Sequence, residues 1–493
     1  MRIGFDHDKY TAMQSEHILK RIAQFGGKLY LELGGKLFDD THASRVLPGF
    51  RPDSKISMLL NLREQAELVI VINAEDIEKN KTRGDLGITY DADVLRLIDA
   101  FRGIGMYVGS VVLTRWNEQR TAVLFKERLE SLGIRVFRHY TIEGYPYNVK
   151  QIVSDAGFGR NEYVETTRPL VLVTAPGPGS GKMAVCLSQL YQEHKRGVQA
   201  GYAKFETFPI WNLSLKHPVN VAYEAATVDL DDHNMIDPYH LETYGVSTVN
   251  YNRDIEIFPV LSAVFQQIYG SSPYASPTDM GVNMVGNCIV DDEVCRDAAH
   301  QEIIRRYYSA RCALRQGHGS TGEVEKLEML LQKSGLSDDD RPVIAAARSR
   351  AEETGEPAAA LRLPDGRLIT GKTTKLLGPS AALLLNALKV LGGIEKSAHL
   401  IPPHVIEPIQ SLKCDYLGNH NPRLHTDEVL LALSISAATD ERAAIAMKQL
   451  PLLKGCEVHT TVILSSVDTN IFKRLGVNLT CDPQYQTHKL YHK

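Results

Sequence analysis

The sequence predicts an α/β protein. It has a large N-terminal domain built on a mostly parallel, doubly wound (Rossmann-like) sheet and a smaller α+β domain at the C-terminus. Over residues 53–207, continuous apolar segments of strand length alternate with amphipathic helices, which is typical of a parallel sheet covered on both faces. A glycine-rich polar segment at residues 315–326 is typical of a domain boundary. We therefore expect domains at residues 1–315 and 323–493.

Length and composition narrow the class of protein. A chain of 493 residues is too long for one compact core, and its net charge of −4 predicts no broad attraction to nucleic acid or anionic membranes. The seven cysteines are scattered without CxxC spacing, which favours a reducing compartment. The N-terminus lacks the apolar core of a signal peptide. We expect a cytoplasmic protein without a nucleic-acid or membrane partner. The oligomeric state, including a homo-oligomer, stays open.

Hydrophobic periodicity and the positions of glycine place the elements of the predicted sheet. A helix at residues 11–24 precedes a short strand that is bracketed by the pairs Gly26-Gly27 and Gly34-Gly35. The alternation then becomes regular, with helices at residues 55–65, 91–102 and 117–132 and strands at residues 68–73, 107–114, 134–139, 170–174 and 199–207.

The segment PLVLVTAPGPGSGKMAVCLSQLYQEHKRG predicts a binding site. It combines a buried strand at Leu170–Thr174, a glycine-rich turn at residues 175–181, and a helix that Lys182 opens. Ligands of open parallel sheets bind at the carboxyl ends of the strands, and both the N–H groups of such a turn and the helix dipole attract anions. A phosphate group is therefore predicted to lie against Lys182 and the backbone of Gly177, Gly179, Ser180 and Gly181.

This loop departs from the Walker A motif, GxxxxGK[ST], at two positions. The motif requires Gly at position 176 and Ser or Thr at position 183, which are Pro176 and Met183 here. The hydroxyl group that would hold Mg²⁺ is missing, although Ser180 or Thr174 could take its place. ATP or another nucleotide with Mg²⁺ is one interpretation of the loop. A structural glycine turn with a surface lysine is the alternative.

A second group of reactive side chains lies at residues 229–240. The side chains in it that bind metals or transfer protons are Asp229, Asp231, Asp232, His233, Asp237 and His240. They could form a divalent-metal or acid–base site beside the phosphate loop, with Asp231, Asp232 and His233 in that role. They could equally form a solvated loop whose carboxylates cap helices. The sequence does not identify a metal.

Two further patterns occur in the C-terminal region. Residues 366–373, GRLITGKT, satisfy the Walker A expression, but LRLPDGRLIT is typical of two β segments joined by a Pro-Asp-Gly turn. We therefore interpret this match as a coincidence. His420 and His425 flank a turn that leads into a helix, and they could bind a metal with Asp427 or simply belong to a capped turn.

Several long stretches of the chain resemble a bacterial family that is catalogued as uncharacterised and of unknown function. They are GGKLFDDTHASRVLPGF, TRWNEQRTAVLFKERLE, VTAPGPGSGKM, KFETFPIWNL, NMIDPYHLETYGV, SPTDMGVNM, LGNHNPRLHTDE and VILSSVDTNIFKRLGVNLTC. The resemblance covers essentially the whole chain. It implies a cytoplasmic bacterial protein with a large N-terminal α/β domain and a distinct C-terminal domain. It supplies no activity or catalytic residues.

The leading functional hypothesis is an enzyme that binds a nucleotide or a small phosphorylated substrate at the glycine-rich loop. In this hypothesis Lys182 neutralises charge on the phosphate, and nucleotide-driven ligation or phosphotransfer is the reaction class. A non-catalytic protein that binds a phosphorylated metabolite is the first alternative, which the absence of a hydroxyl at position 183 favours. A metal-dependent hydrolase that uses residues 229–240 is the second alternative.

Overall fold

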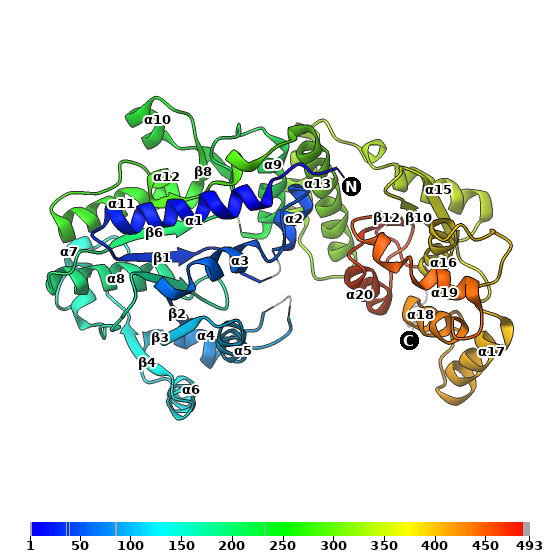
Figure 1. Cartoon of the computed structure of the whole chain (residues 1–493), viewed down its shortest axis with the longest axis horizontal. Helices are drawn as coiled ribbons and strands as arrows, with labels where there is room; N and C mark the ends of the chain where they lie inside the picture. Colours follow the sequence, from blue (N-terminus) through cyan, green and yellow to red (C-terminus); the bar gives the residue numbers. More distant parts are fainter. Residues whose placement is uncertain (1, 36, 39, 84–85, 231, 487–493) are drawn as a thin grey trace. The chain divides into compact units, whose positions relative to one another are not determined.

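The computed structural model divides the chain into two compact units (Figure 1). The first unit contains residues 2–224 and 232–298, and the second contains residues 225–230 and 299–486. The residues that the structure describes are 2–35, 37–38, 40–83, 86–230 and 232–486. None of the helices formed by these residues is long and apolar enough to cross a membrane.

A sheet of seven parallel strands forms the centre of the described part of the first unit, which confirms the predicted α/β class. In spatial order its strands are β4 (Arg135–Tyr140), β3 (Tyr107–Trp116), β2 (Ala66–Asn73), β5 (Leu170–Thr174), β1 (Leu29–Leu33), β6 (Gly201–Phe205) and β9 (Gly281–Val282).

Helices cover both faces of this sheet. One core joins the sheet to α1 (His7–Gln24), α3 (Ser54–Asn61), α5 (Tyr90–Gly103) and α6 (Arg120–Ser131). A second core, on the opposite face, joins it to α7 (Val149–Ile152), α8 (Lys182–Lys195) and α11 (Asn252–Tyr269).

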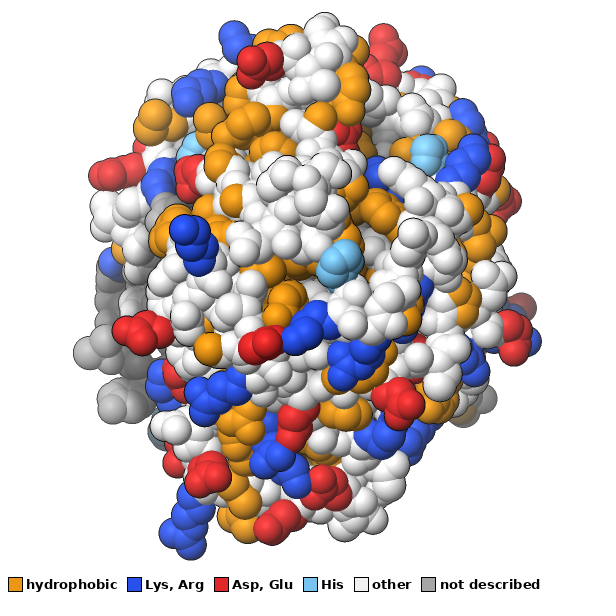
Figure 2. Space-filling model, turned by 90° about the vertical axis from the view of Figure 1, so that its left-hand side faces the viewer, with side chains coloured by type: hydrophobic (Ala, Val, Ile, Leu, Met, Phe, Trp, Pro, Cys, Tyr) orange, Lys and Arg blue, Asp and Glu red, His pale blue; other side chains and the backbone are white. Residues whose placement is uncertain are grey.

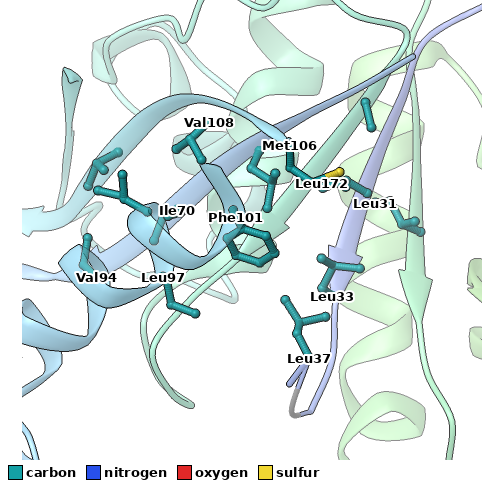
Figure 3. Close-up of a cluster of buried hydrophobic side chains, with 14 of the residues drawn as sticks. Leu31, Leu33, Leu37, Ile70, Val94, Leu97, Phe101, Met106, Val108 and Leu172 are labelled. Carbon is teal, nitrogen blue, oxygen red and sulfur yellow. The ribbon is translucent and has the colours of Figure 1, made fainter. Parts of the chain in front are cut away.

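The two cores explain why the central strands are apolar at every position. Along β2, Leu68, Ile70 and Ile72 point into the first core, whereas Val69 and Val71 point into the second. Successive side chains of a strand face opposite sides, so a strand with a core on each side gains stability from an uninterrupted apolar run. Figure 3 shows the first core, where Phe101 of α5 lies among side chains of β1, β2 and β5.

The chain leaves the neighbouring strands β1 and β5 toward opposite faces of the sheet. From β1 the chain continues to α3 on one face of the sheet, and from β5 it continues to α8 on the other face. Adjacent parallel strands whose helices lie on opposite faces form the topological switch point at which open α/β sheets bind ligands. The glycine-rich loop follows β5 directly at this point.

Short elements complete the chain before residue 299. They are α2 (Thr41–Val46), α4 (Ala74–Glu78), α9 (Pro218–Ala226), α10 (Pro238–Tyr244), α12 (Pro277–Met280) and the antiparallel pair β7 (Asn234–Ile236) and β8 (Val249–Tyr251). Figure 2 shows one face of the molecule, on which basic and acidic side chains are interspersed. This face therefore carries no extended field of one sign.

The second unit has its own mixed sheet of four strands, in agreement with the predicted α+β class. Their order is β11 (Leu368–Lys372), β10 (Ala358–Arg362), β12 (Glu457–Thr460) and β13 (Asn478–Cys481), and only β12 and β13 are parallel to each other. Because β10 and β11 form an antiparallel hairpin, the middle of GRLITGKT is strand. This motif is therefore not a phosphate-binding loop, as its sequence context predicts.

Helices surround the second sheet and build a separate core. The helices of this region are α13 (Asp292–Arg315), α14 (Thr321–Lys333), α15 (Pro342–Thr354), α16 (Pro379–Leu391), α17 (Pro403–Ser411), α18 (Thr426–Ser436), α19 (Glu441–Met447) and α20 (Ser466–Arg474). The core packs α16, α18, α19 and α20 against β10 and β12. The other face of β10 is covered by α15, through Val343 and Ala347.

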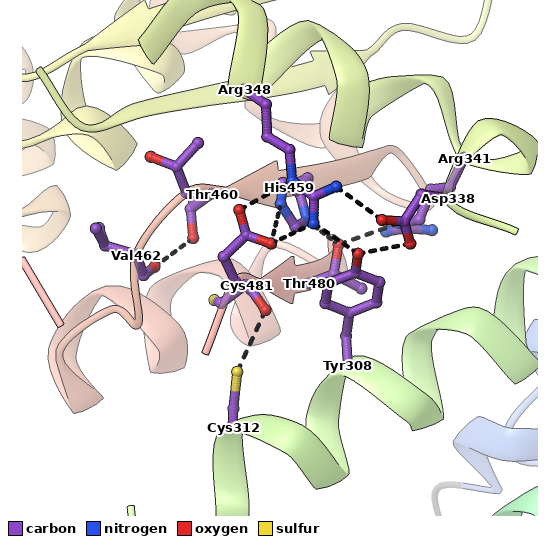
Figure 4. A network of polar contacts seen from close by, with 12 residues as sticks. Tyr308, Cys312, Asp338, Arg341, Arg348, His459, Thr460, Val462, Thr480 and Cys481 are labelled. Atoms are coloured by element: carbon purple, nitrogen blue, oxygen red, sulfur yellow. Dashed lines mark hydrogen bonds and ion pairs between the residues drawn. The ribbon is translucent and has the colours of Figure 1, made fainter. Parts of the chain in front are cut away.

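A buried polar network fixes the second sheet (Figure 4). The guanidinium group of Arg341 is fully buried, and it donates hydrogen bonds to the carbonyls of Val458 and Asn478 at 3.2 and 2.8 Å. It also pairs with Glu457. A buried arginine is tolerated when its donors are all satisfied in this way, so Arg341 ties β12 to β13.

Candidate functional site

The glycine-rich loop connects β5 to α8 and takes its shape from backbone conformations that favour glycine. Gly179 has a φ of +77° and Gly181, the residue before the helix, has a φ of +93°. At Gly177 a Cβ atom would lie 2.2 Å from the hydroxyl oxygen of Tyr90 in α5. Side chains at these positions would strain the backbone or collide with Tyr90. The glycines are therefore required by the local geometry.

Two hydroxyl groups, one from β3 and one from the loop itself, donate hydrogen bonds to carbonyls of the loop. Thr114, near the end of β3, donates a hydrogen bond to the carbonyl of Ser180 at 2.7 Å. The hydroxyl of Ser180 donates to the carbonyl of Gly177 at 2.8 Å, and the side chain of Ser180 is buried. Ser180 thus uses its hydroxyl as a structural tie, so its N–H group is the part that remains for a ligand.

Several backbone N–H groups of the loop have no hydrogen-bond acceptor in the part of the chain that the structure describes. Within the described residues, the amides of Gly179, Ser180, Gly181 and Lys182 donate no hydrogen bond, and the first bond of the helix runs from Val185 to the carbonyl of Gly181. Unsatisfied N–H groups at the start of a helix, together with its dipole, create a positive potential. The loop therefore offers several convergent donors of the kind that hold an anion.

Lys182 places a positive charge beside these donors. Its Nζ lies 3.9 Å from Oε1 of Glu32, near the end of β1, and its side chain is 17% exposed. The other carboxylate oxygen of Glu32 accepts a hydrogen bond from Tyr202 of β6 at 2.7 Å. An ion pair this long leaves the ammonium donors of Lys182 available to a further acceptor.

A second group of charges lies at the end of the neighbouring strand β6. The Nζ of Lys204 is 3.1 Å from Oε1 of Glu206 and 2.7 and 2.5 Å from the two oxygens of Asp254, in the first turn of α11. Burial lowers the pKa of Lys204, but the Asp254 and Glu206 carboxylates outweigh burial and raise this pKa above its usual range. Lys204 is therefore held in its charged form between two carboxyl groups.

The predicted acid–base residues at 231–233 lie in different surroundings. Asp231 is outside the described residues. Asp232 is buried and forms an ion pair with Arg253, which directly precedes Asp254 in α11. His233 is exposed, and its backbone N–H donates a hydrogen bond to the side-chain oxygen of Asn252 at 3.1 Å. Asp232 is thus engaged in an ion pair with α11, whereas His233 is exposed.

Within the same segment, Asp237 has a structural role. Asp237 is buried, and one of its oxygens caps α10 through the N–H groups of Tyr239 and His240. The other oxygen accepts a hydrogen bond from the hydroxyl of Thr278 at 2.6 Å. Among the described residues, no three His, Cys, Asp or Glu side chains are placed to hold a metal ion.

In the second unit, His425 has a different partner from those proposed for a metal site. Its Nδ1 lies 3.0 Å from an oxygen of Asp468, at the start of α20, and this hydrogen bond raises the pKa of His425. The same carboxylate accepts hydrogen bonds from the N–H and hydroxyl of Thr426 at 2.8 and 2.9 Å. His420 is exposed. The arrangement is that of a capped turn, which is one of the two interpretations drawn from the sequence.

Comparison with known proteins gives the family of the chain. A family model described as domain of unknown function DUF1846, N-terminal, matches residues 3–335, and the corresponding C-terminal model matches residues 339–491. The UPF0371 protein cu0538 of Corynebacterium urealyticum is 60% identical over 492 residues, covering 100% of this chain and 99% of the relative. The UPF0371 protein SpyM50764 of Streptococcus pyogenes serotype M5 is 57% identical over 491 residues, with the same coverage.

The chain belongs to the UPF0371 family. This confirms the resemblance that the long sequence stretches indicate, and the family is uncharacterised and of unknown function. Every residue of the site described above lies in the region matched by the DUF1846 N-terminal model. The family itself assigns no role to these residues, so their chemistry has to be argued from their geometry.

Four charged residues of the site are absent from the set predicted from the sequence: Glu32, Lys204, Glu206 and Asp254. A signal for three of them exists in the sequence, because LYLELGG and GYAKFETF carry charged residues at the carboxyl ends of predicted strands. In a parallel sheet these ends meet at one edge. Asp254 has no comparable signal, since it resembles an ordinary acidic residue in the first turn of a helix.

Proposed function

We propose that the protein binds a nucleotide or another small phosphorylated molecule at the glycine-rich loop, and that it is an enzyme of nucleotide-driven ligation or phosphotransfer. The observation that carries the proposal is the set of N–H groups from Gly179 to Lys182 that have no acceptor among the described residues, together with the ammonium group of Lys182. Phosphate oxygens accept hydrogen bonds from such donors, and the helix dipole adds to the attraction.

The surroundings of the loop support chemistry as well as binding. Phosphoryl transfer depends mainly on positioning and on the stabilisation of negative charge, which Lys182 and the loop donors would supply. The charged side chains at the end of β6 lie at the same edge of the sheet as the loop. They would supply proton transfer or orientation. The hydroxyl of Ser180 would not serve as the Mg²⁺ ligand, because it is bonded to the carbonyl of Gly177 within the loop.

The first test compares ligand binding by the wild type and by a Lys182→Ala variant. Isothermal titration calorimetry and thermal melting with ADP, ATP and sulfate, each with and without Mg²⁺, would measure the affinity. A ligand at about 100 times its dissociation constant should stabilise the wild type by about 2.7 kcal/mol. Loss of one charged hydrogen bond costs about 1.5–3 kcal/mol, so we expect Lys182→Ala to weaken binding about tenfold or more.

Lys195→Ala is the matched control, because Lys195 is the last residue of the same helix and pairs with Asp155 at the opposite end. This variant should bind as the wild type does. Equal affinity of the Lys182→Ala variant, or no binding of any phosphate compound to a folded wild type, would overturn the proposal. Once a ligand is found, turnover in its presence separates an enzyme from a binding protein.

A further inference from the structure

The carboxyl group of Glu206 differs from those of Asp254 and Glu32, because one of its oxygens accepts no hydrogen bond from the described residues. Both oxygens of Asp254 accept from Lys204, and the two oxygens of Glu32 face Lys182 and Tyr202. The Oε1 of Glu206 faces Lys204 at 3.1 Å. Within the described residues, Oε2 of Glu206 accepts no hydrogen bond, and it is not among the fully buried polar atoms that lack a partner, so it keeps some exposed surface.

The charged groups around Glu206 are not completely buried. The side chains keep small exposed fractions of 17% for Lys182, 12% for Glu32, 16% for Lys204, 10% for Glu206 and 16% for Asp254. They project from the carboxyl ends of β1 and β6 and from the first turns of α8 and α11. A small ligand held at the glycine-rich loop would therefore lie at the edge of the sheet where Oε2 of Glu206 is accessible.

We infer that Glu206 is the proton-transfer residue of this site. In its ionised form, Oε2 accepts the proton of a substrate hydroxyl group as that oxygen forms a bond to the terminal phosphorus of the bound nucleotide. The bond from this phosphorus to the bridging oxygen breaks, the nucleoside diphosphate leaves with the electron pair, and Glu206 becomes a neutral carboxylic acid. In the reverse direction the carboxylic acid returns the proton to the oxygen that leaves. The inference rests on the proposed function, because the substrate is the molecule held by the loop.

The environment of Glu206 places its protonation equilibrium in the range that proton transfer requires. Burial raises its pKa, Lys204 lowers it, and Asp254 and Glu32 raise it again, so that the pKa is about 7. A general base is most effective when its pKa lies close to the working pH. The titratable and charged groups that face Glu206 are Glu32, Lys204, Tyr223, Tyr251 and Asp254.

The pH dependence of the free energy of unfolding offers an independent test of the raised pKa of Glu206. The folded-state pKa of Glu206 is raised above its unfolded value, so ionisation of this group destabilises the fold. Protonated Glu206 contributes stability that is fully present below the pKa of this group in the unfolded chain. That contribution is lost as the pH rises through the pKa of Glu206 in the folded protein. The Gln variant carries no such ionisation. We therefore expect the stability of Glu206→Gln, relative to the wild type, to increase between about pH 4.5 and about pH 7.

The direct test is carbon NMR of the full chain labelled with ¹³C at the side-chain carboxyl of glutamate. One resonance should titrate with a midpoint near neutral pH in the wild type, and it should be missing in Glu206→Gln. Glu193→Gln is the control, because Glu193 is a buried carboxylate that pairs with Lys28 before the amino end of β1. That variant should retain the near-neutral resonance. If Glu206→Gln does not fold, Glu206→Asp, which is invisible to this label, serves in its place.

The same titration in the presence of sulfate separates the inference from the proposed function. Sulfate keeps its charge at neutral pH, and an anion within a few ångströms should raise the midpoint of Glu206 by about one unit or more. If sulfate or ADP binds but no glutamate resonance titrates near neutral pH, the role of Glu206 is overturned and the proposed function stands. The same holds if the midpoint of Glu206 does not shift when sulfate binds. If neither sulfate nor ADP binds, the proposed function fails and the role of Glu206 falls with it.

Discussion

Single residues of the loop are explained by contacts that act over a few ångströms. Gly177 lies against Tyr90, Gly179 and Gly181 have positive φ values, and Ser180 ties the turn together with its hydroxyl. The sequence predicts a glycine-rich turn at these positions, because glycine has few other reasons to recur so closely. It does not predict the contact with Tyr90, since α5 lies far away in the chain.

At this scale we predict that Gly177→Ala destabilises the protein and that Tyr90→Phe partly compensates. The added Cβ would lie 2.2 Å from the Tyr90 hydroxyl, so α5 or the loop must shift, which costs about 1–3 kcal/mol. Removing the hydroxyl relieves the closest contact, so the two substitutions should be non-additive in a double-mutant cycle. Chemical denaturation of the four proteins measures the coupling.

Gly179→Ala is the control for that cycle, because a Cβ at Gly179 meets no atom within 4 Å. The loss in free energy of unfolding caused by Gly179→Ala should come from backbone strain alone. It should therefore be the same with Tyr or Phe at position 90. Additivity of Gly177→Ala and Tyr90→Phe would show that the hydroxyl does not limit the loop.

Whole elements show where hydrophobic periodicity is informative and where it fails. The continuous apolar runs of β2 and β5 predict central parallel strands, and both strands have cores on each side. The helix α8 follows a different rule, because it also buries polar side chains. Gln189 is satisfied by the N–H and the carbonyl of Val164, at 3.0 and 2.8 Å. The sequence of a helix does not reveal that a neighbouring segment will supply hydrogen-bond partners for its buried polar side chains.

For the second unit we predict that Arg341→Lys destabilises strongly. Lysine has three donors at one point and cannot reproduce the hydrogen bonds that the buried guanidinium group makes to β12 and β13. Unsatisfied buried carbonyls and a weakened pair with Glu457 should lower the free energy of unfolding by about 3 kcal/mol.

The comparison for that prediction is Arg350→Lys in α15, the helix that Arg341 directly precedes, where Arg350 pairs with Glu353 at the surface. This substitution should change the free energy of unfolding by less than about 0.5 kcal/mol. Urea denaturation followed by circular dichroism measures both variants. Similar stabilities for the two would show that the buried network contributes little.

At the scale of the whole molecule, the two units have separate hydrophobic cores. The sequence predicts two domains with a boundary at residues 315–323, and the family models meet at residues 335–339. By contacts within the structure, residues from Ala299 onward group with the second unit. Separate cores can open independently, each with its own free energy.

We therefore predict that a bound nucleotide protects the first unit from hydrogen exchange and leaves the second unit unchanged. With ADP, the amides of the glycine-rich loop and the start of α8 should exchange more slowly, because the ligand binds only the folded site. Strands β10 to β13 should exchange at the same rate with and without ADP. Hydrogen-exchange mass spectrometry measures both regions, and the Lys182→Ala variant should lose the protection. Slower exchange of β12 or β13 would contradict the prediction.

The sequence alone determined the fold class, the family and the strand–loop–helix segment that carries the candidate phosphate site. These depend on local periodicity, on the positions of glycine and on long stretches that resemble a known family, all of which can be read along the chain. Only the tertiary structure brought Glu32, Lys204, Glu206 and Asp254 to that site. Their proximity depends on the order β5–β1–β6 in the sheet and on the packing of α11, and residues so distant in the chain meet only after these strands pair.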